Sequence, residues 1–127
     1  MKNKHFWDNF INAISGIVTA VKNERHMKFH VLATCLVIPL SIYYRISKLE
    51  FIAVILTISA VISAEMINTA IEAVVDLATS EYNEKAKIAK DVAAGAVLVS
   101  AVFSSVVGYL VFFDRVSGDI IKLFDKV

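Results

Sequence analysis

Apolar residues recur at steps of three and four between Phe6 and Val21, and polar residues fill much of the opposite side. This spacing predicts an amphipathic helix over about residues 4–26. Such a helix fits two places: a membrane interface, where its aromatic residues would be anchors, or the surface of a helical bundle. The long apolar runs that follow favour the interface.

Three longer segments are apolar almost throughout, at about residues 29–46, 49–78 and 88–113. At about 1.5 Å per residue, each is long enough to cross the roughly 30 Å of hydrocarbon in a bilayer. The short connector from Arg45 to Lys48 predicts an antiparallel hairpin, and the polar second connector offers Ser80 or Asn83 as the cap of the third helix. We therefore expect an all-α membrane protein, residues 1–127 forming a single domain with three transmembrane helices and an interfacial one.

Basic residues near the helix ends predict the orientation. Eight of them fall on the side of the amino terminus and the second connector: Lys2, Lys4, Lys22, Arg25, Lys28, Lys85, Lys87 and Lys90. Five fall on the other side: Arg45, Lys48, Arg115, Lys122 and Lys126. Because cytoplasmic loops carry the excess of Lys and Arg, we expect the amino terminus and the second connector to face the cytoplasm, with the protein in the cell membrane.

Composition agrees with the membrane and excludes other classes of protein. The chain is 57% apolar with a net charge of +1, so no basic excess is available for nucleic acid, and binding to nucleic acid is not expected. Cys35 is the only cysteine, which excludes an internal disulfide or a multi-cysteine metal site. His26 and His30 share a helix face, but two ligands are too few for a closed zinc site.

Small residues line one face of the third apolar segment at four-residue spacing: Ala96, Ser100, Ser104 and Gly108. Such a row allows another helix to approach closely. Three transmembrane helices form a thin bundle with little interior, so we expect a homo-oligomer.

Polar residues form a stripe near the end of the second apolar segment, and we name it the carboxylate stripe: Glu65, Asn68, Thr69, Glu72 and Asp76. At about 100° per residue, these five side chains fall within an arc of roughly 100°. A charged side chain costs about 2.5 to 3.5 kcal/mol at the centre of a bilayer. The stripe should therefore lie near the interface and face protein, water or a divalent cation, or pair in salt bridges with Lys85, Lys87 or Lys90.

Charged residues from other segments should lie at the same level as the stripe. Lys90 and Asp91 begin the third apolar segment, and Glu24 ends the amphipathic one. Carboxylates from separate helices can share a magnesium ion, and a lysine can hold phosphate oxygens. The four glycines are far apart and form no P-loop, so side chains would have to build any phosphate site.

The motif EMINTAIEAVVD, the connector residues Ser80, Glu81 and Tyr82, and the sequence Ala89, Lys90, Asp91 followed by AAGAV form a specific combination. It resembles the small trimeric prokaryotic lipid kinases, which comprise bacterial diacylglycerol kinase and the Gram-positive undecaprenol kinase. The resemblance covers nearly the whole chain, from about Phe6 to Phe113.

The resemblance implies a role for each matching residue. Glu65 would be the catalytic base, and Glu24 and Glu72 would bind the Mg²⁺ of MgATP. The nucleotide site would be lined by those two glutamates and by Glu81, Tyr82, Asn83, Lys90 and Asp91, with Asn68 and Asp76 in support. The family further implies a homotrimer whose active sites are shared between neighbouring subunits.

The leading interpretation is an ATP-dependent kinase of a membrane lipid alcohol. The segment ERHMKFH is more similar to the undecaprenol branch than to the diacylglycerol branch, so undecaprenol is the expected substrate and diacylglycerol the alternative. A noncatalytic membrane scaffold or a proton-coupled transport subunit is the alternative of another class, because intramembrane carboxylates also serve as proton relays. A relay would spread its acids across the bilayer, whereas these cluster at one end of a helix.

Overall fold

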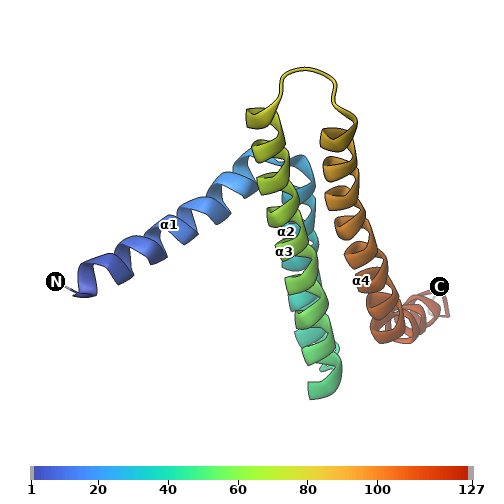
Figure 1. Ribbon diagram of the computed structural model, residues 1–127. Helices are drawn as coiled ribbons and strands as arrows, with labels where there is room; N and C mark the ends of the chain where they lie inside the picture. The colour runs from blue at the N-terminus through green and yellow to red at the C-terminus, as the bar shows by residue number, and fades with distance from the viewer. Residues whose placement is uncertain (1, 126–127) are drawn as a thin grey trace.

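The computed structural model describes residues 2–125, with side chains from Phe6 onward, and these residues form four helices and no strand. The helices are α1 (Lys2–Asn23), α2 (Arg25–Tyr43), α3 (Lys48–Ala78) and α4 (Glu84–Phe124). Figure 1 shows α2, α3 and α4 running alongside one another, while α1 projects from the upper end of this bundle. The predicted all-α architecture is confirmed.

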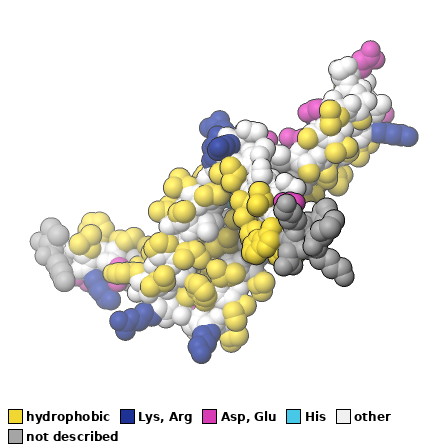
Figure 2. Space-filling view, turned by 90° about the vertical axis from the view of Figure 1, so that its left-hand side faces the viewer, with side chains coloured by type: hydrophobic (Ala, Val, Ile, Leu, Met, Phe, Trp, Pro, Cys, Tyr) yellow, Lys and Arg dark blue, Asp and Glu magenta, His cyan; other side chains and the backbone are white. Residues whose placement is uncertain are grey.

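Three of these helices, α2, α3 and α4, are long and apolar enough to cross a membrane. Few described residues are buried, and large apolar side chains such as Leu36, Leu56 and Leu110 are more than 60% exposed. Figure 2 shows hydrophobic side chains over much of the visible face, with Lys and Arg toward its margins. A surface of this kind suits hydrocarbon as the surrounding solvent, and the protein is a membrane protein.

The predicted amphipathic segment ends earlier than expected, because the chain bends at Glu24. This residue has extended backbone angles, φ −94° and ψ 125°, and occupies the N-cap position of α2 without a capping hydrogen bond from its side chain. The bend separates α1 from the bundle and places the junction of α1 and α2 at the same end as the α3–α4 connector (Figure 1). The carboxyl terminus of α4 lies toward the opposite end, as the sequence predicts.

Side-chain caps fix where the two later helices begin. Ser47 and Glu50 form a capping box at the start of α3, in which each side chain accepts from the other's backbone N–H. Asn83 caps α4, and its Oδ1 accepts from the N–H groups of Lys85 and Ala86 at 2.9 and 3.2 Å. Of the two caps that the sequence offers for this helix, Asn83 is therefore the one used.

The third transmembrane helix does not end at Phe113, as the apolar pattern predicts, but continues to Phe124 as part of α4. Residues 114–124 contain no proline, and Gly118 alone does not break the helix. At about 1.5 Å per residue, 41 residues exceed the roughly 30 Å that a span requires, so the last turns lie beyond it. Figure 1 shows them leaving the bundle axis.

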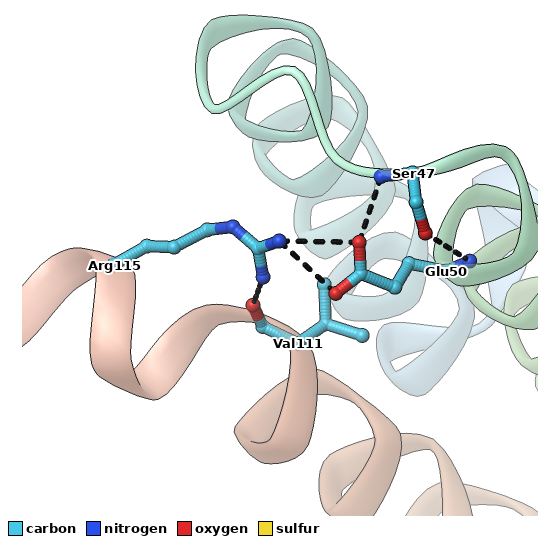
Figure 3. A network of polar contacts seen from close by, with 4 residues as sticks. All are labelled: Ser47, Glu50, Val111 and Arg115. Atoms are coloured by element: carbon cyan, nitrogen blue, oxygen red, sulfur yellow. Dashed lines mark hydrogen bonds and ion pairs between the residues drawn. The ribbon is translucent and has the colours of Figure 1, made fainter.

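A polar network fastens this extension to the connector between α2 and α3. Nitrogen NH2 of Arg115 lies 3.0 and 3.1 Å from the two carboxylate oxygens of Glu50, while NH1 donates to the carbonyl oxygen of Val111 (Figure 3). Tyr44 donates to Asp119 Oδ2 at 3.1 Å. Burial, followed by this hydrogen bond and the charge of Asp119, raises the pKa of Tyr44.

The small apolar core lies near the same end of the bundle. Val54 of α3 packs with Val111 and Phe112 of α4, and α2 adds Val37 and Leu40 around them. This packing anchors α3 at its beginning. The carboxylate stripe lies toward the other end of α3, so the fold separates its main packing cluster from its cluster of charged residues.

Candidate active site

Glu65 is the buried member of the carboxylate stripe. It is 4% exposed, and it is the one ionisable side chain that is buried among the described residues. Its Oε1 lies 3.4 Å from Nε2 of His30, which reaches it from α2. Glu65 therefore faces protein and not lipid. This is one of the arrangements expected to lower the free-energy cost of placing a carboxylate in a membrane helix.

Asn68 and Glu72 follow one and two turns after Glu65 and contact each other. Asn68 Nδ2 donates to Glu72 Oε1 at 2.9 Å, which turns the amide oxygen away from the carboxylate. That oxygen, Oδ1 of Asn68, is buried and has no partner among the described residues. Buried amide oxygens normally accept a hydrogen bond or bind a cation, so this atom marks a place where a ligand group is expected.

Asp76, the last member of the stripe, pairs with Lys90 on α4. The distance from Lys90 Nζ to Asp76 Oδ1 is 2.5 Å, and the two side chains are 37% and 67% exposed. One of the salt bridges that the sequence left open as an alternative is therefore present. Because an exposed pair is worth only about 0 to 1 kcal/mol, Lys90 can exchange this carboxylate for another anion at little cost.

Thr69 is the one stripe residue whose side chain is hydrogen-bonded to the backbone of its own helix. Its hydroxyl donates to the backbone carbonyl of Glu65 at 3.0 Å, one turn earlier in the same helix. The four remaining stripe residues thus carry the candidate functional groups.

Several residues predicted for the nucleotide or metal site lie apart from this cluster within one chain. Tyr82 is 84% exposed, Glu81 and Asp91 are exposed, and Asn83 is occupied in capping α4. Glu24 is half-buried at the bend between α1 and α2. Over the described part of the chain, no three His, Cys, Asp or Glu side chains come together as a metal site. The roles predicted for these five residues stay predictions.

The residues near the stripe nevertheless fit magnesium carried by a nucleotide. Mg²⁺ binds oxygen ligands and commonly uses one or two carboxylates, together with water and substrate phosphates. The Glu72 carboxylate and the unpartnered Oδ1 of Asn68 are oxygen donors on adjacent turns. An all-protein cage of three or more ligands is not required for this mode of binding.

His30 is the site neighbour that sequence reasoning missed. The sequence indicates only that His26 and His30 share a face of one helix, as a pair too small for a closed zinc site. Its approach to Glu65 depends on how α2 is rotated against α3, which periodicity within one helix does not specify. The one sign of a role for His30 in the sequence is weak: it is an ionisable residue at the second position of an apolar segment.

A cleft of about 270 Å³ opens between α2, α3 and α4, and His30 is one of the residues that line it. Most of its lining is apolar, and it extends from Phe29 and His30 toward Gly108 and Phe112. The cleft therefore runs along the span from the level of the stripe toward the small core.

Comparison with known proteins decides what kind of protein carries this site. The model of the family described as prokaryotic diacylglycerol kinase matches residues 11–112. The chain belongs to the prokaryotic diacylglycerol kinase family. The resemblance seen in the sequence is thereby confirmed, and the protein is a lipid kinase that transfers a phosphoryl group from ATP to a lipid.

Relatives within the family carry two different names. Undecaprenol kinase of Bacillus subtilis is 40% identical over 110 residues, which cover 87% of this chain and 89% of that protein. Diacylglycerol kinase of Synechocystis is 37% identical over 101 residues, or 79% of this chain and 58% of that protein. Diacylglycerol kinase of Haemophilus influenzae is 30% identical over 102 residues, or 80% and 86%.

Membership in the kinase family indicates which reaction the residues of the carboxylate stripe serve. The matched region includes the whole carboxylate stripe, His30 and Lys90. Phosphoryl transfer to an alcohol needs a group that accepts the hydroxyl proton and cations that offset the phosphate charge. A buried carboxylate, two further oxygen ligands and an exchangeable lysine are the kinds of group that this reaction requires.

Proposed function

We propose that this kinase phosphorylates the primary hydroxyl of undecaprenol, with Glu65 as the general base. The observation that carries the proposal is the burial of Glu65 against His30, whose side chain lines a cleft between the membrane helices. A lipid alcohol lying along the span can bring its hydroxyl to this carboxylate while its chain stays in an apolar environment.

In the proposed reaction, Glu65 accepts the proton of the lipid hydroxyl as its oxygen attacks the γ-phosphorus of ATP in line. The new bond joins the lipid oxygen to phosphorus, and the bond from phosphorus to the β,γ-bridging oxygen breaks, which releases ADP. Glu65 later returns the proton to solvent. A carboxylate is sufficient as a base because the hydroxyl proton becomes more acidic as its oxygen bonds to phosphorus.

Glu72 and Glu24 are the proposed ligands of the nucleotide's magnesium, with Asn68 in support. When bound, Mg²⁺ offsets the negative charge of the phosphates. Lys90 would leave Asp76 for the transferring phosphoryl group, which the weakness of an exposed pair permits. The exposed residues Glu81, Tyr82 and Asp91, with Asn83 at the cap of α4, are proposed to line the nucleotide site from the α3–α4 connector.

A homotrimer with shared active sites accounts for the scatter of these residues in one chain. Glu24 lies at a bend from which α1 leads away from the bundle (Figure 1). A neighbouring subunit would bring its own Glu24 to the Glu72 of this chain, or its own Glu72 to this Glu24.

The site is proposed to open to the cytoplasm, where ATP is available. The excess of basic residues at the end of the bundle that carries the stripe supports this orientation.

Undecaprenol is preferred to diacylglycerol because the Bacillus relative named undecaprenol kinase has the higher identity and covers more of this chain than the two diacylglycerol kinases. The segment ERHMKFH supports the same choice. Diacylglycerol, which would give phosphatidic acid, remains the alternative substrate.

A competition assay tests the choice of lipid. Purified protein in mixed micelles receives MgATP with undecaprenol and diacylglycerol at equal mole fraction, and phosphate on each lipid is measured. We expect undecaprenyl phosphate to dominate. Phosphatidic acid as the main product would reverse the choice, and phosphate on neither lipid would mean that the kinase acts on a different lipid alcohol.

A further inference from the structure

His30 and Glu65 form a contact between two helices that no predicted role explains. The side chains are 18% and 5% exposed, and the 3.4 Å between His30 Nε2 and Glu65 Oε1 is slightly longer than a hydrogen bond. Contacts of catalytic groups are often this long before substrates bind. Nitrogen Nε2 is a donor both in imidazolium and in one of the two neutral tautomers.

The contact concerns one oxygen of the Glu65 carboxylate. A general base that takes a proton from an alcohol needs one oxygen aimed at the hydroxyl and the rest of the group held still. With Oε1 held by His30, Oε2 is left for the substrate. The contact thus supplies an orientation that the α3 backbone alone would not fix, because a glutamate side chain has several rotamers.

The histidine is itself held in place. The hydroxyl of Thr34, one turn later on α2, donates to its backbone carbonyl at 2.8 Å. The ring of Phe29 lies edge-on to the imidazole, with centroids 5.7 Å apart. Met27, which is fully buried, fixes the same turn of α2 in the bundle. The imidazole therefore sits on a packed part of the helix.

His30 also borders the cleft. Its side chain lines the cleft between α2, α3 and α4, so one residue borders both the apolar space and the buried carboxylate. A hydroxyl at this end of the cleft therefore lies next to an imidazole that contacts Glu65. The residue is thus placed to orient the base at the point where an alcohol would arrive.

We propose that His30 is the positioning residue of this kinase, holding Glu65 Oε1 so that Oε2 faces the lipid hydroxyl. This inference rests on the proposed role of Glu65 as base. It assigns no bond-making step to the imidazole. Its effect is on the fraction of time that the base points at the substrate, and therefore on kcat more than on the KM for ATP.

Isosteric substitutions separate positioning from packing. In His30→Gln the amide nitrogen can take the place of Nε2, whereas in His30→Asn the amide reaches only as far as Nδ1. We expect His30→Ala and His30→Asn to lower kcat by about 100-fold, the scale of a 1 Å misplacement of a catalytic group. His30→Gln should recover most of that loss, and the KM for ATP should change by less than about threefold in all three.

His26→Gln is the matched control, because His26 lies one turn earlier on the same helix and is exposed. It should keep the kcat of the natural protein. Thermal unfolding of each variant checks folding. If His30→Gln and His30→Asn lose kcat equally, or if the losses follow the losses in melting temperature, His30 is a packing residue and the proposal is wrong.

A double-mutant cycle tests whether His30 acts through Glu65. In a Glu65→Gln background, His30→Ala should lower the residual turnover by less than about threefold, because there is no base left to orient. An equal 100-fold loss in both backgrounds would overturn the inference. The same cycle tests the base separately. If Glu65→Gln alone leaves turnover near normal, the proposed base is wrong, whatever the effect of His30→Ala.

Discussion

Lys90 and Asp76 join α3 to α4 beside the connector between these helices, with 2.5 Å between Nζ of Lys90 and Oδ1 of Asp76. Exposed pairs of this kind contribute about 0 to 1 kcal/mol to stability. The interaction is therefore too weak to explain a lysine at this place as a structural element. In the proposed reaction it keeps a cation beside Asp76, one turn from Glu72 on α3, and available for phosphate.

Lys90→Met should lower kcat/KM for ATP by about 10- to 100-fold, while the free energy of unfolding changes by less than about 1 kcal/mol. The measurements are initial rates across ATP concentration and a denaturation curve. Lys87→Met, on the first turn of the same helix, is the control and should retain activity. Equal losses in both variants would mean that general positive charge, and not this lysine, matters.

Glu72→Gln should raise the Mg²⁺ concentration needed for half-maximal activity by about tenfold or more, because a carboxylate ligand is replaced by a neutral amide. The measurement is activity across a magnesium titration at fixed ATP, and excess chelator should abolish activity in the natural protein. Thr69→Val is the matched control on the same stripe, since its hydroxyl is bonded to the backbone of its own helix. An unchanged magnesium requirement in Glu72→Gln would show that Glu72 does not bind the metal.

Tyr44 makes stability sensitive to high pH. Its pKa is raised in the fold by burial and by the hydrogen bond to Asp119, so the folded state favours the protonated phenol. A raised pKa contributes stability below the unfolded value, about 10, and the contribution is lost as the pH rises through the folded value. The melting temperature of the natural protein should therefore fall more steeply above about pH 10 than that of Tyr44→Phe. Parallel curves for the two proteins would contradict this interpretation.

Much of the fold follows from the sequence because it depends on patterns within single helices. Hydrophobic length identifies the three spans, and the step pattern of Glu65, Asn68, Glu72 and Asp76 fixes their common arc before any packing is known. The cap at Asn83 follows from side-chain chemistry close in sequence. These features need no knowledge of how one helix is rotated against another.

Contacts between helices could not be predicted in the same way. His30 reaches Glu65 from another helix, and Arg115 meets Glu50 across 65 positions of sequence. The continuation of α4 beyond Phe113 was missed because the fall in hydropathy at Asp114 resembles a helix end, whereas it marks only the end of the apolar region. The convergence of Glu24 with Glu72, which the family resemblance implies, depends on a neighbouring subunit and stays a prediction.

The most direct test of the account is the turnover of Glu65→Gln with undecaprenol and MgATP, measured beside equilibrium binding of ATP. Because the substitution keeps size and removes only the ability to accept the proton, we expect ATP affinity within about threefold of the natural protein and turnover reduced by about 10²- to 10⁴-fold. Turnover close to that of the natural protein would contradict the assignment of Glu65 as the base.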